Sequence, residues 1–287
     1  MLTIANVLAP FSSLAFLVAV GLAQTPDVTP TFDVISIKPN TSGALFVQLK
    51  PAPGGKFLAT NVTTRMLLGV AFGSDQPLHD FQIVAGPKWL ASERFDVRAQ
   101  ADDPSLTDHI NVAVRAMLED RFQLKAHFES RELPIYELKI MKGGPNLTRS
   151  EELPTDLAAE QSPRTQSDIS KLQAIKPRAG AVFGGPGTIR ASGISMPRLA
   201  YMLSNVLDRI VVDETALIGL FDTKLAFETN APSTLEVQNG LPTTARRPED
   251  SRPSLSFALE QLGLRLEPTK GAVDVLVIDY IQEPDAN

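Results

Sequence analysis

The sequence GKFLATNVT at residues 55–63 and the sequence GTIRASGIS at residues 187–195 share one pattern, and this repetition decides the predicted fold. Each segment starts with glycine, reads as a short strand and ends at a hydroxyl residue, Thr63 or Ser195. An apolar series at helical spacing follows in both cases, so the hydroxyl can accept hydrogen bonds from the first free N–H groups of a helix. The chain is therefore predicted to contain two copies of one small unit.

The two halves continue in parallel beyond this first helix. Both contain an alternating strand with a Phe-Asp pair, then a second amphipathic helix, then two further strands. The corresponding segments are 94–99 with 220–225, 110–118 with 255–262, 122–125 with 264–267, and 135–140 with 273–278. Strand groups this short, separated by helices, predict an α+β fold. We expect two similar lobes, each a small mixed or antiparallel sheet packed by two helices, with the element order β-α-β-β-α-β-β.

Two stretches fit none of these elements, and they set the predicted domain boundaries. Residues 149–186 and 229–253 are rich in Pro, Ser, Gln and charged residues. Such segments bury too little apolar surface to offset the entropy cost of ordering, so both are expected to be mobile. The prediction is a first lobe at 24–148, a flexible linker at 149–186 and a second lobe at 187–287 that carries the insertion 229–253.

Composition excludes several classes of function. The chain is 43% hydrophobic and 21% charged, as an ordinary globular protein is. Its 33 acidic and 27 basic residues give a net charge of −6, so a nucleic-acid partner is not expected. The chain has no cysteine, which excludes disulfides, iron–sulfur clusters and thiolate nucleophiles.

The N-terminus predicts export. Residues 5–23 are mostly apolar, and the small residues Gly21 and Ala23 suit signal peptidase, so we predict a signal peptide at 1–23 that is cleaved after Ala23. The mature protein would then be periplasmic or extracellular. The segment has no Lys or Arg, and it is close to the ~18 apolar residues that can span a bilayer, so an uncleaved anchor is the alternative. Contact with a membrane is expected only through this segment.

Short catalytic motifs are missing from the sequence. The string GISMP at 193–197 lacks the last glycine of a nucleophile elbow, and GGK at 54–56 is only a fragment of a phosphate-binding loop. His79, His109 and His127 have no metal-ligand spacing, and structural roles are favoured for His109 and His127. No catalytic, cofactor-binding or metal-binding residue is assigned, and no cofactor is expected.

Two carboxylates and four aromatic residues are the remaining candidates. Asp96 and Asp222 each follow a Phe in corresponding strands and could act as an acid–base pair, although a repeated position favours a structural role. Phe32, Trp89, Phe95 and Tyr136 could line a glycan- or peptide-binding face. Core packing is favoured for these aromatic residues because each lies in an alternating apolar pattern.

Several sequence blocks in a fixed order carry a family resemblance. They are FDVISIKPN at 32–40, FQIVAGPKWL at 81–90, RFD at 94–96, LEDRF at 118–122, RELPIY at 131–136, VVDETALIGLFD at 211–222 and the closing blocks between 261 and 279. Together they resemble the bacterial domain-of-unknown-function 3738 family over nearly the whole mature chain. Ala216 stands where that family usually has Gly.

The resemblance implies an exported protein of a kind found as many paralogues in soil acidobacteria, with no established activity and no assigned catalytic residues. A related domain sometimes follows a membrane-embedded zinc peptidase of the antirepressor type, which suggests at most a sensing or binding role.

Two functions are left to weigh. The favoured one is a non-catalytic binding, interaction or sensing module of the cell envelope, with an envelope protein or glycan as partner and the cleft between the lobes as contact surface. The alternative is a hydrolase of envelope polymers that uses carboxylates such as Asp96 or Asp222. Whether the protein is an enzyme stays open at this stage, with the non-catalytic function preferred.

Overall fold

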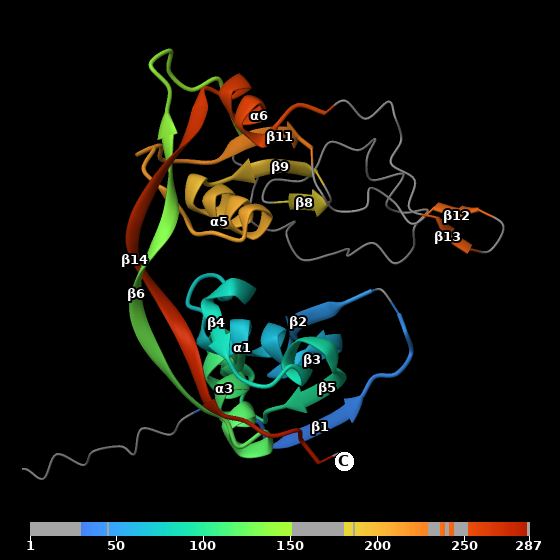
Figure 1. Cartoon of the computed structure of the whole chain (residues 1–287). Coiled ribbons are helices and arrows are strands. Elements are labelled where there is room, and N and C mark those ends of the chain that lie inside the picture. Colours follow the sequence, from blue (N-terminus) through green and yellow to red (C-terminus); the bar gives the residue numbers. More distant parts are fainter. Residues whose placement is uncertain are drawn as a thin grey trace, which may run out of the picture.

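Two long strands form a ribbon that runs along one side of the molecule and joins two lobes (Figure 1). They are β6 (Lys125–Ile140), with 16 residues, and β14 (Leu264–Tyr280), with 17, and they pair antiparallel along their length. Two short strands extend this sheet through parallel pairing: β10 (Val211–Asp213) beside β6 and β4 (Ile83–Ala85) beside β14. This computed structural model describes residues 30–44, 46–150, 181–185, 187–228, 236–238, 241–243 and 252–285.

The first lobe contains a four-stranded antiparallel sheet in the order β1-β5-β3-β2, with helices packed on it. Its strands are β1 (Val34–Pro39), β2 (Gln48–Ala52), β3 (Lys56–Thr63) and β5 (Arg94–Gln100). Its helices are α1 (Thr64–Phe72), the short α2 (Trp89–Ser92), α3 (Ile110–Arg121) and the 3-10 turns η1 (Asp80–Gln82) and η2 (Pro104–His109).

The second lobe contains a sheet in the order β7-β11-β9-β8 and two helices. Its strands are β7 (Thr148–Arg149), β8 (Ala181–Gly185), β9 (Thr188–Ile194) and β11 (Phe221–Ala226). Its helices are α5 (Met196–Leu207) and α6 (Leu255–Gln261). A separate hairpin pairs β12 (Glu236–Gln238) with β13 (Leu241–Thr243). The predicted α+β class is confirmed.

Hydroxyl caps begin the helices that follow β3 and β9, as the sequence predicted. The Thr63 hydroxyl accepts a hydrogen bond from the Met66 N–H at 3.3 Å, and the Ser195 hydroxyl accepts one from the Arg198 N–H at 3.4 Å. These bonds satisfy donors that have no partner within the first turn of a helix. The chain therefore changes from strand to helix at corresponding cap residues in the two lobes.

The ribbon contributes core residues to both lobes. Leu276 and Ile278, from the late strand β14, are buried in the core of the first lobe among side chains of α1 and α3. Leu138, from the early strand β6, is buried in the core of the second lobe together with Leu264. Each lobe is thus completed by a strand that the sequence assigns to the other half of the chain.

The predicted element order is wrong at its last two strands. Segments 122–125 and 135–140 were expected to contain separate strands, but one continuous strand, β6, runs from Lys125 to Ile140, and β14 likewise runs through both later segments. Pro134 lies between the two earlier segments and Gly271 between the two later ones, and residues of these types are uncommon inside a strand. Pro134 lies opposite Lys270 and Gly271 opposite Leu133, so these residues lie within the paired ribbon and end no strand.

Several further predictions fall partly or wholly outside the described residues. The signal peptide at 1–23 lies outside them, and so do residues 151–180 of the predicted linker and most of the insertion. Within 149–186, residues 181–185 form the edge strand β8, which pairs with β9. Among the residues that the structure describes, no helix has the length and apolar character needed to cross a membrane.

The shared cores lead to a prediction about stability. Replacing Leu276, which is 0% exposed, by alanine should lower the free energy of unfolding by about 2–5 kcal/mol, because it opens a cavity in the first lobe. Urea denaturation followed by circular dichroism measures the change. Glu132→Ala, on the exposed part of β6, is the matched control and should change stability by less than about 0.5 kcal/mol. Equal effects of the two substitutions would contradict the packing of β14 in the first lobe.

Candidate functional site

Asp96 stabilises a bulge in the sheet of the first lobe. The pairing of β3 with β5 shifts register between Ala59 and Val62, and Asn61 inside this bulge has a left-handed φ of 57°. Asp96 Oδ1 accepts hydrogen bonds from the Asn61 backbone N–H at 2.9 Å and from Asn40 Nδ2 at 2.7 Å. The carboxylate therefore satisfies a backbone donor that the bulge removes from the sheet.

Asp222 has the same role in the second lobe. The pairing of β11 with β9 shifts register between Phe221 and Thr223, and Gly193 in β9 has a φ of 74°. Asp222 Oδ1 accepts hydrogen bonds from the Gly193 N–H at 3.0 Å and from the Ser192 hydroxyl at 3.2 Å. Asp96 and Asp222 lie in separate sheets of separate lobes, so the fold does not bring the two carboxylates together.

A polar hollow lies beside the bulge of the first lobe. It has a volume of about 440 Å³. The residues that line it are Asn40, Thr41, Gly43, Ala44, Asn61 and Arg94. They come from the loop after β1, from the bulge in β3 and from the first residue of β5. Because bulges often redirect side chains at functional sites, this hollow is the leading candidate for a binding site.

Hydrogen bonds within the hollow fix most of its polar groups. Asn61 Nδ2 donates to the carbonyl oxygens of Ala44 and Phe46, which holds the loop against the sheet. Asn40 Oδ1 accepts from the N–H and the hydroxyl of Ser42 at 3.0 and 2.6 Å. Arg94 Nη1 donates to the Asn61 carbonyl oxygen at 2.8 Å. The amide side chains therefore shape the hollow, while the Arg94 guanidinium keeps further N–H donors.

A second polar site joins the lobes at a distance from the hollow. His79 precedes η1, is 6% exposed and stacks between Phe81 and Tyr201 of α5, with ring centroids 5.0 and 4.4 Å away. Its Nδ1 lies 2.8 Å from Oδ1 of Asn205, also on α5. Burial lowers the pKa of His79, and the hydrogen bond to Asn205 opposes this shift only in part. The imidazole is therefore held neutral at a contact between the first lobe and α5.

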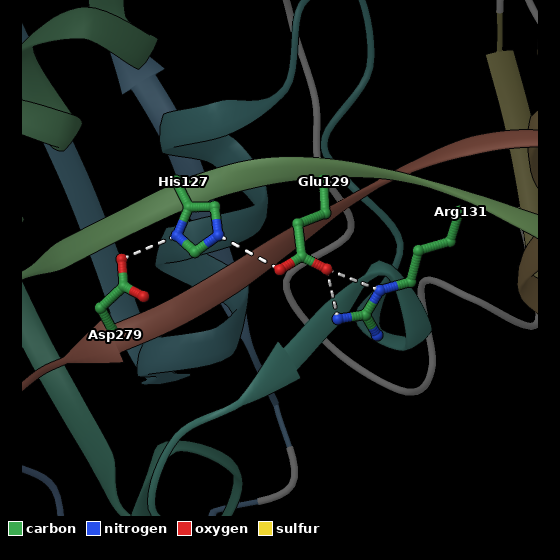
Figure 2. A network of polar contacts seen from close by, with 4 residues as sticks. All are labelled: His127, Glu129, Arg131 and Asp279. Carbon is green, nitrogen blue, oxygen red and sulfur yellow. Dashed lines mark hydrogen bonds and ion pairs between the residues drawn. The ribbon is translucent and has the colours of Figure 1, made fainter.

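A network of charges lies on the exposed part of the ribbon. Figure 2 shows His127 between two carboxylates, with Nδ1 at 2.8 Å from Asp279 Oδ2 and Nε2 at 3.3 Å from Glu129 Oε1, while Arg131 pairs with Glu129. The hydrogen bonds to Asp279 and then Glu129 raise the pKa of His127. Because both partners favour the protonated imidazole, the network suits a surface ion pair better than a general base.

A similar network lies near the other end of the ribbon. Lys139 Nζ lies 2.7 Å from both Glu137 Oε2 and Glu267 Oε2, and Arg265 pairs with Glu267 at 2.6 Å. The two carboxylates raise the pKa of Lys139 to about 12. Side chains two positions apart in a strand point to the same face, so β6 residues 127, 129, 131, 137 and 139 share one face. Both networks therefore lie on the face opposite Leu138.

The other residues named from sequence serve the fold. Phe32, Trp89 and Phe95 pack in or against the first core, whereas Tyr136 packs against the second, so the four aromatic residues form no common face. His109 is the exposed residue before α3 and makes no side-chain cap bond. Within the described ranges, no group of three or more His, Cys, Asp or Glu residues could hold a metal ion.

Sequence reasoning missed Asn40, Arg94 and His79 as candidate site residues. Asn40 and Asn61 are 21 positions apart in the sequence, and both donate a hydrogen bond to Asp96, which lies on β5. No local spacing marks such a site. Aligning the two halves of the sequence could have identified Arg94. Both halves have the Phe-Asp pair, but the residue before it is Arg94 in the first half and Leu220 in the second.

Comparison with known proteins gave one family. A family model described as "Protein of unknown function (DUF3738)" matches residues 65–281. No curated protein and no solved structure matched the chain.

The bulge contacts predict how Asp96 contributes to stability. Asp96→Ala should lower the free energy of unfolding by about 1–3 kcal/mol, because the nearly buried Asn61 N–H loses its acceptor. Asp96→Asn keeps an acceptor oxygen and should cost clearly less. Asp222→Ala is the matched change in the second lobe and should have a similar effect to Asp96→Ala. If Asp96→Ala were as stable as the wild type, the structural role would be wrong.

The buried histidine predicts a pH effect. Because the pKa of His79 is lowered in the folded protein, its contribution to stability is complete above the unfolded pKa of about 6.5 and is lost as the pH falls below it. The free energy of unfolding of the wild type and of His79→Phe is measured by urea unfolding from pH 8 to pH 5. As the pH falls, the wild type should lose stability relative to His79→Phe.

A matched control for this experiment is His127→Gln. Because the pKa of His127 is raised in the folded protein, its contribution to stability is complete below about pH 6.5 and is lost as the pH rises through the folded pKa. The wild type should therefore gain stability relative to His127→Gln as the pH falls. If both stability differences changed in the same direction with pH, the opposite pKa shifts of His79 and His127 would be wrong.

Proposed function

Because the chain belongs to the DUF3738 family, whose description assigns no function, we propose a function from the site and from the N-terminal sequence: a non-catalytic binding or interaction module of the cell envelope. The observation that carries this proposal is the polar hollow of about 440 Å³ beside the first-lobe bulge. Its volume falls in the usual range for small-ligand sites, and its shape is maintained by hydrogen bonds of Asn40 and Asn61.

Binding accounts for this site better than hydrolysis does. The hydrolase alternative was motivated by carboxylates such as Asp96 or Asp222, which could have formed an acid–base pair. Each of these carboxylates instead accepts a backbone N–H within its own sheet, in a different lobe. A carboxylate pair for glycoside hydrolysis would need separations of roughly 5–10 Å across one substrate. The alternative therefore loses the two residues that motivated it.

The proposed location is outside the cytoplasm. The apolar leader at 1–23 and its small residues before the cleavage position support export, with cleavage after Ala23. Retention of the leader as a membrane anchor is the other route to the same side of the membrane. In either case the proposed partner is an envelope glycan or an envelope protein.

We also infer that the two lobes arose by duplication of one unit. The matching caps at Thr63 and Ser195 support this inference, and so do the matching bulges held by Asp96 and Asp222. The order β-α-β-β-α followed by a ribbon strand occurs in both halves, if the short helix α2 and the 3-10 turns of the first half and the hairpin β12–β13 of the second are left out. Shared features of the lobes are then features of the fold, and differences between them indicate function.

This proposal is tested by expressing the full-length chain with a C-terminal tag in a Gram-negative bacterium. The protein should be recovered from the periplasm with a mass that shows the loss of residues 1–23. Recovery in the membrane fraction at full mass would support the anchor instead. Recovery in the cytoplasm would contradict export.

The exported protein, immobilised on beads, should then retain a glycan or protein from an extract of bacterial envelopes. Gly43→Asn is the variant for comparison: Gly43 has a φ of 66° with open space where a Cβ would lie, and asparagine tolerates this backbone while narrowing the hollow. Retention above background by the wild type alone supports the proposal. Capture of nothing by the wild type would contradict a binding module.

A further inference from the structure

The two bulges differ in one charged residue. Both have a carboxylate that accepts a backbone N–H, Asp96 in the first lobe and Asp222 in the second. Arg94 lies two residues before Asp96, whereas Leu220, 37% exposed, holds the corresponding place before Asp222. The carboxylate is thus part of the shared fold, whereas an arginine at this strand position belongs to the first lobe alone. In the second lobe Arg149, from β7, lies over the Phe221 ring and donates to the Ile218 carbonyl oxygen instead.

Arg94 is a cation without a carboxylate partner among the described residues. The Arg94 residue is partly buried, and within the described part of the chain its side chain makes one hydrogen bond, from Nη1 to the Asn61 carbonyl oxygen at 2.8 Å. That bond fixes the guanidinium at the wall of the hollow. The donors that remain form a planar fork, which matches the two oxygens of a carboxylate.

We propose that this hollow binds a sugar acid, with the carboxylate of the ligand on Arg94 and its hydroxyl groups toward Thr41 and Asn40. The inference rests on the proposed binding function and names the ligand class for the same site. The hollow of about 440 Å³ accepts a monosaccharide unit. None of the described lining residues is a large apolar side chain, which favours a ligand rich in hydroxyl groups over an apolar peptide.

Asp96 modulates the charge of this site. It lies on the same strand face as Arg94 and would repel a bound carboxylate, but its Oδ1 accepts two hydrogen bonds, from Asn40 and Asn61. These donors stabilise the negative charge within the bulge. The site therefore combines the Arg94 cation with the hydrogen-bonded Asp96 carboxylate and neutral polar groups. Because Asp96 opposes a second negative charge, binding of a single sugar acid is expected to be weak, with a Kd of about 1 mM.

The test is a titration of the purified protein with four probes. Isothermal calorimetry compares D-glucuronate, its uncharged amide D-glucuronamide, D-glucose and the carboxylate peptide N-acetyl-alanyl-alanine. Glucuronate should bind at least about tenfold more tightly than its amide, because only the carboxylate accepts both Arg94 donors. Equal binding of the amide, stronger binding of the peptide, or no heat with glucuronate at about 20 mM would each overturn the sugar-acid assignment.

Variants place the binding in the hollow. Arg94→Gln should weaken glucuronate binding at least about tenfold, and Arg94→Lys should recover part of it, because it restores the charge without the fork. Arg98→Gln is the matched control, since Arg98 is an exposed residue on the same strand outside the lining of the hollow. Binding that survives Arg94→Gln would overturn the proposal.

Gly43→Asn gives an independent measurement if the Arg94 variants fail to fold, because it narrows the hollow without touching the Arg94 bond to Asn61. It should also weaken glucuronate binding, and unchanged binding would contradict the site. Failure of the sugar-acid assignment is distinguishable from failure of the binding function. In the first case the wild type still retains an envelope component but shows no preference for glucuronate; in the second it retains nothing.

Discussion

The structure depends on the pairing of β6 with β14. Their antiparallel register joins residues from the two halves of the chain along the whole ribbon, from Lys125 opposite Tyr280 to Ile140 opposite Leu264. The same pairing delivers Leu276 to the first core and Leu138 to the second. Neither lobe has a complete core without a strand from the other half. Folding of one lobe is therefore coupled to folding of the other through contacts that are distant in sequence.

In the middle of the ribbon, β6 continues through Pro134 and β14 continues through Gly271. Gly271 leaves space there: a Cβ at this position would lie 2.5 Å from Cδ1 of Ile135, so this side chain, which is 7% exposed, would have to shift. The absence of a side chain on β14 makes room for the isoleucine of β6. Gly271 is unusual in a strand when the sequence of β14 is considered alone, but it fits once β14 is paired with β6.

Local patterns predicted those parts of the fold that depend on local interactions. The caps at Thr63 and Ser195 and the alternating strand before α3 follow from spacing within ten residues or so, and the structure contains them. The ribbon instead pairs residues that are far apart in sequence, such as His127 and Val277, and no local periodicity reports such a pairing. The family resemblance placed Ala216 at a usual glycine position, and its left-handed φ of 55° gives the physical reason for that glycine.

The candidate site was predictable only in part for the same reason. Asp96 stood out because it repeats as Asp222, yet repetition is what marks it as a structural residue. Arg94 was not selected, since a single arginine at the start of a strand has no motif around it. Its meaning comes from the contrast between two similar bulges, one with a guanidinium fixed on the Asn61 carbonyl oxygen and one with Leu220 in its place. Where a fold contains two copies of one structural device, the shared residues explain the geometry. The residue that only one copy has is the place to look for chemistry, because the fold itself does not require it.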